Sequence, residues 1–452
     1  MTPITDFLTA YAHSGFTRFH MPGHKGAPPE SFPAFLRAVC PYDLTEIKGA
    51  DELYEPEGII ARSEESAAAL YGSGWTAFSA GGSTLCILTM VAAALRAAGT
   101  PEGGEVVAAR NAHLSFVNAC VHVGARIHWL MPPYDRETGL CLPVTAGDVA
   151  AAMDAHPGAK VVYITSPDYY GVEADVKGIA EAVRARGGFL LVDNAHGAHL
   201  TAFPGRHPME AGADLCCDSP HKTLPVLTGG SLLHCRAGME DAFPKESVKR
   251  LMTLYGSTSP SYLIMASLEQ AVNWMAGEGK AAFRALYARW EALKTALLAA
   301  GLPLLPRVTD PTKITIDAYG AGYTAGELAE SLRAAKMEPE YAGGGKVVLM
   351  LSPQTPGRDY DRLLSWAKTL PERPAIPYPD ALLAPEPAMT PREAFYRESE
   401  LKPVAECLGR IAAETRITCP PGVPVVVAGE KIGESEKKLL LDSGIFSLNV
   451  LK

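Results

Sequence analysis

The feature that most limits the fold of this chain is an alternation of short apolar runs with helical stretches between about residues 105 and 235. The runs read "EVVAARNA", "ARIHWLMP", "KVVYITSP", "FLLVDNAH" and "GGSLLHC", and helical stretches such as "VKGIAEAVRARGG" separate several of them. Two further helices, "EESAAALYG" and "STLCILTMVAAALRAAG", precede the series. Buried strands that alternate with helices predict an α/β fold with a mostly parallel central sheet covered on both faces. Ligands of such sheets bind at the carboxyl ends of the strands.

The rest of the chain divides into segments of different character. Residues 1–55 form a mixed opening segment, and the large α/β domain is expected over 56–301, closed by the helix "AAFRALYARWEALKTALLAAG". A small α/β domain is expected over 302–370. Residues 371–391 contain seven prolines and are expected to be a linker, and a C-terminal domain follows over 392–452.

Charge and cysteine usage narrow the class of protein. The net charge of -9 argues against a nucleic-acid partner, because phosphate binding needs clustered Lys and Arg. The nine cysteines include no CxxC pair, which favours reduced thiols. The N-terminus has no apolar core of the signal-peptide type, and the run "LCILTMVAAAL" is too short to span a bilayer. These features predict a cytoplasmic protein without a membrane partner.

The stretch "DSPHKTLPVLTGG" places Lys222 before eight residues without a charge. A surface cation is one interpretation. The other is an amine in a dry pocket that forms a Schiff base, because apolar surroundings favour the neutral amine. The usual partner of such a lysine is pyridoxal phosphate (PLP), which also needs an acid for its ring nitrogen, a cradle for its phosphate and a group against its ring.

The candidate acid is Asp193, which follows four apolar residues in "FLLVDNAH" and lies 29 residues before Lys222. A carboxylate at the end of a buried strand needs a cation or donors, and a pyridinium N–H is one such partner. A helix N-cap or a salt bridge explains the same pattern equally well.

The candidate phosphate cradle is "SAGGSTLCILTM". Gly81 and Gly82 allow close backbone approach, and Ser83 and Thr84 add hydroxyl donors at the start of a helix, where anions bind. The same sequence is also an ordinary helix cap. Two residues that flank Lys222, Ser219 and His221, are expected to complete the cradle.

Histidines supply the candidates for the ring face, and all twelve lie at or before His234. His113 follows the strand "EVVAA" and either stacks on the ring or is a structural histidine. Ala195 is expected on the opposite face, with His196 near the phenolic oxygen or a substrate carboxylate. The spacing of His196 and His199 also suggests a metal site, which we reject because no third ligand is evident.

Several stretches resemble the fold-type I, PLP-dependent Orn/Lys/Arg decarboxylases in their shorter bacterial form. They are "FHMPGHKG", "DLTEIKGADELYEPEGII", "RNAHLSF", "TSPDYYGVEAD", "LLVDNAHGAHL", "DSPHKTLPVLTGGSLLH", "TSPSYLIMASLEQA", "GRIAAE" and "CPPGVPVVVAGEKI". The resemblance implies an aminotransferase-like large domain that binds PLP. It also implies decarboxylation of lysine, arginine or ornithine to an amine of polyamine metabolism, and a homodimer or higher oligomer with shared sites. The N-terminal flavodoxin-like domain of the larger members is not expected, nor is an assembly built on it.

Carried over by this resemblance, Lys222 is the Schiff-base lysine, Asp193 pairs with the pyridine nitrogen and His113 stacks on the ring. Hydroxyl and imidazole groups hold the phosphate: Ser83, Thr84, Ser219 and His221. The hydroxyls of residues 257–259 are expected to reach the phosphate in a neighbouring subunit.

Four positions depart from the family pattern. Gly81-Gly82 replaces Asn-Gly, Leu114 replaces a lysine, Asp168 replaces a threonine and Cys419 replaces a tyrosine. None of them is the lysine or the pyridine acid, so they bear on the substrate rather than on cofactor binding.

Substrate and reaction stay open at this point. The acids that are candidates for the distal cation of a basic amino acid are Asp168, Glu406 and Glu414. Arg410 and Arg416 keep transamination open, alongside aldol-type cleavage, because aminotransferases bind the α-carboxylate through a late arginine. A ligand sensor without turnover is a further alternative, and the motif "FHMPGHKG" fits either a pocket entrance or a subunit contact.

Overall fold

The computed structural model describes residues 1–378, 386–418 and 423–452, which leaves Cys419 and part of the proline-rich linker outside the described residues. The chain forms two compact units. The first unit contains residues 1–97 and 191–280, and the second contains residues 98–190 and 281–452.

The first unit is built on strands in the order β1-β9-β8-β7. They span Ser73–Ser79 (β1), Ser231–Arg236 (β9), Leu215–Asp218 (β8) and Phe189–Asn194 (β7). β7 pairs in parallel with β8, whereas β9 is antiparallel to both β8 and β1. Three of the four strands therefore point the same way, and β7 and β8 end side by side.

Helices with apolar faces cover these strands. α4 (Gly82–Ala97) contacts β8, β9 and α10 (Lys245–Tyr255), while α3 (Ile59–Tyr71) and α11 (Tyr262–Trp274) contact β1. α4 has an almost continuous run of buried residues from Leu85 to Leu95, as expected for a helix enclosed between a sheet and another helix. Shorter helical segments of the unit are η2 (Ala198–Ala202), α8 (Pro208–Ala211), α9 (Pro220–Thr223) and η3 (Met275–Gly279).

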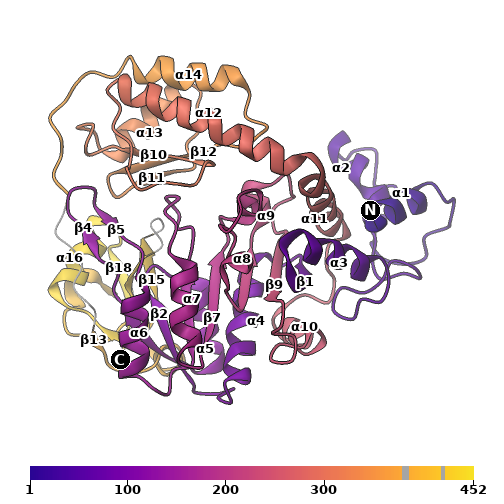
Figure 1. The fold of residues 1–452 in the computed structure, drawn as a ribbon, viewed down its shortest axis with the longest axis horizontal. Coiled ribbons are helices and arrows are strands. Elements are labelled where there is room, and N and C mark those ends of the chain that lie inside the picture. The colour runs from indigo at the N-terminus through magenta and orange to yellow at the C-terminus, as the bar shows by residue number, and fades with distance from the viewer. Residues whose placement is uncertain (379–385, 419–422) are drawn as a thin grey trace. The chain divides into compact units, whose positions relative to one another are not determined.

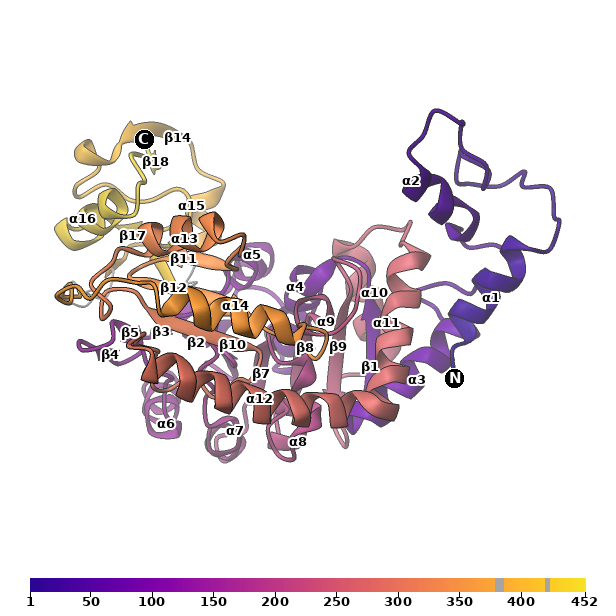
Figure 2. The same cartoon turned by 90° about the horizontal axis from the view of Figure 1, so that it is seen from above.

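The N-terminal segment extends from this unit. α1 (Pro3–Ala12) packs against α3 and α11, and the chain then runs outward through α2 (Ala34–Val39) and η1 (Cys40–Tyr42) before it returns, as Figures 1 and 2 show.

The second unit contains three groups of strands. The first group, all parallel, has the order β6-β2-β3, with bounds Val161–Thr165, Glu105–Ala109 and Arg126–Leu130. Its helices are α5 (Leu114–Val123), α6 (Ala146–Ala155) and α7 (Val176–Arg184), and a small hairpin pairs β4 (Tyr134–Asp135) with β5 (Leu140–Cys141).

The second group is antiparallel, in the order β10-β12-β11, with bounds Lys313–Asp317, Lys346–Met350 and Tyr341–Gly343. α12 (Lys280–Ala299) is fixed to β10 by a hydrogen bond from the Trp290 indole to the Lys313 carbonyl at 2.6 Å. The remaining helices of this group are α13 (Ala325–Ala334) and α14 (Gly357–Ala367).

The third group forms the C-terminal part, in which β14 pairs with β18, β15 with β16 and β13 with β17. Buried residues including Val404, Ile432 and Leu448 form its core. The bounds are β13 Glu386–Pro387, α15 Pro391–Phe395, β14 Ser399–Pro403, η4 Val404–Glu406, β15 Arg416–Thr418, β16 Val423–Val426, β17 Glu430–Lys431, α16 Glu434–Asp442 and β18 Ser447–Leu451.

The α/β fold with mostly parallel strands expected from the sequence is confirmed. Each run that we interpreted as a strand is present, and so are the helices named above. Among the strands of the first unit, β1 and β8 were not predicted from the sequence. Among the described residues, no helix is long and apolar enough to cross a membrane.

Candidate active site

Asp193 lies at the carboxyl end of β7, where the sequence ends a run of fully buried leucine and valine side chains. Its side chain is buried, and Oδ1 accepts a hydrogen bond from the Ala195 amide at 3.1 Å. The Cys217 thiol, from the residue opposite on β8, donates to the same oxygen at 3.7 Å. Burial raises the pKa of Cys217 well above its ordinary value, so this thiol stays protonated and remains a donor.

Lys222 follows the end of the neighbouring strand. β8 ends at Asp218, Ser219 caps the one-turn helix α9, and Lys222 lies within that turn. The lysine is half-buried, and its Nζ is 3.3 Å from Nε2 of His196, which is buried. Because His196 follows Asp193 by three residues, the amine lies beside the loop that leaves β7.

The start of α4 lies in the same unit. Gly82 has a φ of +69°, which favours glycine, and its amide donates to the Gly229 carbonyl at 2.8 Å. The next residues are Ser83, which is half-buried, and Thr84, which is exposed. The turn therefore presents both hydroxyls where the helix begins, next to the loop after α9.

Two residues that flank Lys222 have distinct hydrogen bonding. The Ser219 side chain is buried, and within the described part of the chain its hydroxyl has no hydrogen-bond partner. A buried hydroxyl without a partner is costly, so it indicates a place for a ligand atom. His221 lies within hydrogen-bond distance of the Gly230 carbonyl through Nδ1, at 2.8 Å, and burial lowers its pKa. A neutral imidazole whose Nδ1 donates to that carbonyl satisfies both observations.

His113 belongs to the second unit. It is the N-cap of α5, and its Nδ1 accepts the Ser115 amide at 3.2 Å, so in the neutral ring Nε2 carries the proton. The ring is exposed.

Of the candidate acids and arginines in the second unit, all but Glu406 have hydrogen-bond or ion-pair partners among the described residues. Asp168 is buried, and its Oδ1 accepts the amides of Tyr170 and Val172 at 2.9 and 2.8 Å. Asp168 thus stabilises its own turn.

In the C-terminal part, Arg410 pairs with Glu400 and Arg416 with Glu414, each at 2.9 Å. Glu406 lies exposed in η4.

The motif "FHMPGHKG" forms a turn whose side chains bond to one another and to nearby residues of the N-terminal segment. His20 contacts the Tyr11 hydroxyl at 2.8 Å, His24 lies 3.2 Å from Asp43, and the Lys25 amine donates to the His20 carbonyl at 2.5 Å. Phe19, in contrast, is 95% exposed. The turn therefore presents an aromatic ring to solvent, while its polar side chains have hydrogen-bond partners within residues 1–55.

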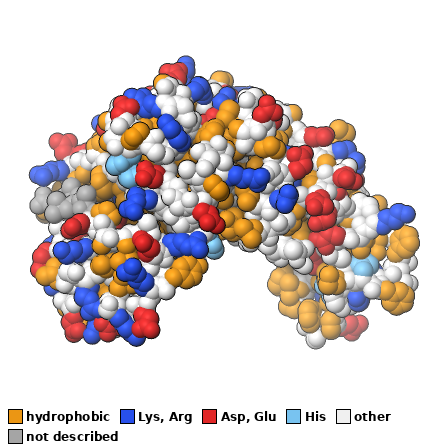
Figure 3. Space-filling view, turned by 90° about the horizontal axis from the view of Figure 1, so that it is seen from below, with side chains coloured by type: hydrophobic (Ala, Val, Ile, Leu, Met, Phe, Trp, Pro, Cys, Tyr) orange, Lys and Arg blue, Asp and Glu red, His pale blue; other side chains and the backbone are white. Residues whose placement is uncertain are grey.

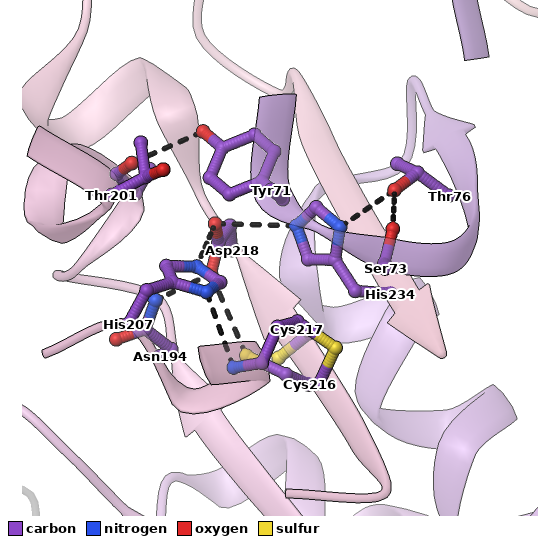
Figure 4. A network of polar contacts seen from close by, with 12 residues as sticks. Tyr71, Ser73, Thr76, Asn194, Thr201, His207, Cys216, Cys217, Asp218 and His234 are labelled. Carbon is purple, nitrogen blue, oxygen red and sulfur yellow. Dashed lines mark hydrogen bonds and ion pairs between the residues drawn. The ribbon is translucent and has the colours of Figure 1, made fainter. Parts of the chain in front are cut away.

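A group of buried polar residues in the first unit was not predicted from the sequence. Asp218 contacts His207 and His234 at 3.0 and 3.3 Å, and all three side chains are fully buried (Figure 4). Two features of the sequence hint at this group: Asp218 lies four residues before Lys222, and all the histidines lie before residue 235. The pairing itself is not evident, because His207 and His234 lie 11 and 16 residues from Asp218 along the chain.

Comparisons with known proteins match two parts of the chain to models of one family. The major-domain model of the Orn/Lys/Arg decarboxylases matches residues 2–299, and the model of their C-terminal domain matches residues 378–441. The chain belongs to the Orn/Lys/Arg decarboxylase family. An arginine decarboxylase of Bacillus subtilis is 32% identical over 98% of this chain and 94% of its own length.

Further relatives and solved structures are similar to this chain. An arginine decarboxylase of Halalkalibacterium halodurans is 31% identical over 96% of this chain and 91% of its own length. Among solved structures, the lysine decarboxylase of Francisella novicida has a TM-score of 0.84 at 19% identity, and the match covers 100% of this chain and 81% of that one. A serine palmitoyltransferase structure with PLP covers 68% of this chain and 74% of its own at a TM-score of 0.54 and 15% identity. At these identities the structures show the fold, which is that of fold-type I enzymes.

Proposed function

We propose that this member of the Orn/Lys/Arg decarboxylase family uses PLP to decarboxylate L-arginine to agmatine and CO2. The main observation in support of this reaction is the position of Asp193 at the end of β7 and of Lys222 in the turn that follows the adjacent parallel strand β8. The choice of arginine among the basic amino acids is supported by relatives called arginine decarboxylase that match nearly the whole chain.

The residues of the first unit fit PLP. In this proposal Lys222 forms the Schiff base and Asp193 faces the ring nitrogen. The phosphate takes the unpartnered hydroxyl of Ser219 together with donors from Ser83, Thr84 and His221. Ala195 and His196 line the loop beside the ring, and His113 is the proposed stacking group.

When bound, PLP supplies an electron sink for the pair of electrons left by the departing carboxylate. The chain supplies the rest. Asp193, held by the Ala195 amide, would keep a proton on the ring nitrogen, and Lys222 or His196 would return a proton to Cα after CO2 leaves. The contact of 3.3 Å between Lys222 and His196 allows the two groups to share that task.

The test measures CO2 and amine formation from L-arginine, L-lysine and L-ornithine with PLP present. We expect arginine to give the highest kcat/KM. Lys222→Ala should reduce kcat by about 1,000-fold or more, because it removes the covalent anchor and a proton donor. The matched control is Lys368→Ala, which removes an exposed lysine of the second unit and should leave kcat unchanged.

Other outcomes of the same assay separate the alternatives. Formation of a keto acid without CO2 indicates a transaminase, and a higher kcat/KM with lysine or ornithine rejects arginine as the substrate. Purified protein that gains no visible absorption band with PLP contradicts the proposal and favours a ligand sensor.

We also propose that the protein is a homodimer that forms through its N-terminal segment. Apolar side chains gather on this projecting part of the first unit in the space-filling view (Figure 3). Phe16, Phe19 and Phe35 are 72%, 95% and 69% exposed, and soluble monomers rarely expose large apolar patches. Residues 257–259, whose hydroxyls we expect to reach a partner's phosphate, are exposed as that role requires.

A further inference from the structure

A buried polar network lies at the end of β8, directly before the turn that contains Lys222. Asp218 is the last residue of β8, and its side chain is fully buried. Figure 4 shows the network around it, whose other members come from α3, β1, β7, β9 and the N-cap of α8.

Four donors surround the Asp218 carboxylate. Oδ2 contacts His207 Nε2 and His234 Nε2 at 3.0 and 3.3 Å. Oδ1 accepts the Asn194 amide at 2.6 Å and the Cys216 thiol at 3.7 Å. Burial alone raises the pKa of Asp218, but the two imidazoles outweigh it and hold the pKa below its ordinary value.

The hydrogen bonds orient the protons of the network. His207 Nδ1 accepts the Met209 amide at 3.3 Å, so the proton on this ring is on Nε2 and points at Asp218. His234 Nδ1 contacts the Thr76 hydroxyl at 2.8 Å, which in turn contacts Ser73 at 2.8 Å. Burial lowers the pKa of His234, and a neutral ring that donates through Nε2 satisfies every contact.

The network joins the two strand ends of the proposed site. Asn194 follows Asp193 on β7 and is the register partner of Asp218 on β8. The Asp218 carbonyl accepts the Ser231 hydroxyl of β9, which fixes the peptide that leads to Ser219.

Tyr71 adds a second connection between the network and β7. Its ring packs on His207 and His234 with centroids 4.8 and 4.5 Å away, and its hydroxyl donates to the Ala198 carbonyl in the loop after Asp193.

We infer that Asp218 is a positioning residue of this site, which holds the end of β7 that contains Asp193 against the end of β8 that leads into Lys222. The inference rests on the proposed function, because it assigns Asp218 to a PLP-lysine site. The titratable groups that interact with Asp218 are His207, His234, Tyr71 and the thiols of Cys216, Cys217 and Cys86, and Asp218 is the anion among them.

A metal site is the competing interpretation of the same cluster. The ligand atoms of His207, Cys216 and Asp218 lie within 4.8 Å of one another. Both ring nitrogens of His207 and both carboxylate oxygens of Asp218 already take part in hydrogen bonds, however. The chain therefore satisfies this cluster without an ion.

The test uses Asp218→Asn in the full-length protein with PLP. The asparagine amide keeps the shape of the carboxylate but removes the buried negative charge. Its NH2 group also faces hydrogen-bond donors of the network instead of acceptors. An anion stabilises a nearby cation, so the pH midpoint of the visible absorption band of PLP joined to Lys222 should move down by about half a unit or more. We expect kcat to fall by about 10-fold or more, with the KM for arginine changed by less than about twofold.

The matched control is Glu269→Gln in the same unit. Glu269 is another buried carboxylate with four contacts, from the amides of Ile4 and Thr5 and the hydroxyls of Thr5 and Ser63. Glu269→Gln should lower the melting temperature without moving the midpoint of the band or kcat.

A second pair of variants covers the case in which Asp218→Asn does not fold. His234→Gln keeps a donor for Asp218, and His234→Leu removes it. The glutamine variant should retain at least about tenfold more activity and a midpoint closer to wild type.

The possible failures are distinguishable. A wild-type protein without a PLP band rejects the proposed function and the inference with it. A normal wild-type band with an unchanged midpoint and kcat in Asp218→Asn rejects the inference alone, as do equal shifts in Glu269→Gln. Stoichiometric zinc in the purified protein that is lost in His207→Gln also overturns it.

Discussion

Asp168 and Asp218 are both buried carboxylates, yet their pKa values move in opposite directions. Burial raises the pKa of Asp168 to about 6, since the backbone amides of Tyr170 and Val172 offset only part of the cost. At Asp218 the two imidazoles outweigh the same cost. The donors that meet each carboxylate, rather than the depth of burial, therefore decide the direction in which its pKa moves.

The raised pKa of Asp168 predicts a pH-dependent stability. An acid with a raised folded-state pKa contributes stability that is present below 3.8 and is lost as the pH rises through about 6. Asp168→Asn keeps a side-chain oxygen that accepts from both amides, but it has no acid that titrates, so its stability does not fall over this pH range. Its free energy of unfolding relative to wild type should therefore increase by up to about 3 kcal/mol between pH 4 and pH 7.

Urea unfolding of both proteins across this pH range measures the effect. A constant difference at all pH values contradicts the assignment. The same variant tests whether Asp168 binds the distal cation of the substrate. A rise in the KM for arginine well above twofold would indicate that it does.

Some residues of the proposed site were predictable from the sequence and others were not. Asp193 and Lys222 are found from sequence because each has a local signature, an acid after an apolar strand and a lysine before an uncharged run. His207 and His234 have no such signature. Their role depends on Asp218, and the pairing of β8 with β9 that brings His234 there is antiparallel, which the expected βαβ pattern does not contain.

At the scale of elements, one buried ion pair connects the turn after β2 to the C-terminal part. Arg110 and Glu430 are 1% and 2% exposed and form two side-chain contacts, the second of 2.8 Å. Arg110 also donates to the Pro424 carbonyl at 3.2 Å, and Glu430 accepts the Val427 amide at 2.7 Å. Because Arg110 lies three residues before His113, this pair fixes the turn that presents the proposed stacking ring.

We predict that Glu430→Gln lowers the free energy of unfolding by about 3 kcal/mol, because it leaves the Arg110 charge buried without a counterion. Thermal and urea unfolding measure the loss. The control is Glu338→Gln, which removes an exposed partner of Arg333 and should cost less than about 1 kcal/mol. Equal losses in the two variants contradict a special role for the buried pair.

The elements themselves were largely predictable. Long apolar runs such as "FLLVDNAH" and the helix over 280–299 have periods that local sequence reveals. β1 and β8 were missed because "SGWTAFS" mixes small and polar residues and "LCCD" has only four residues. Both strands are defined by pairing with β9, which is information that a window of sequence does not contain.

At the scale of the whole molecule, the N-terminal segment exposes several large aromatic side chains. The polar groups of its "FHMPGHKG" turn bond within the segment, whereas Phe19 at 95% and Phe35 at 69% exposure leave large apolar surfaces in water. A second copy of the chain would remove that surface from water, and burial of aromatic side chains contributes strongly to association.

We therefore predict that the wild-type protein is a dimer and that Phe19→Ser combined with Phe35→Ser raises the dimer dissociation constant by at least about tenfold. Light scattering after size-exclusion chromatography over a dilution series measures this constant. Phe395→Ser, which removes a 55% exposed ring of the second unit, should leave it unchanged. If residues of both subunits complete each site, specific activity of the double variant falls on dilution and recovers at high protein concentration. A wild-type monomer at every concentration, or a double variant that stays dimeric, would show that the N-terminal segment has another role.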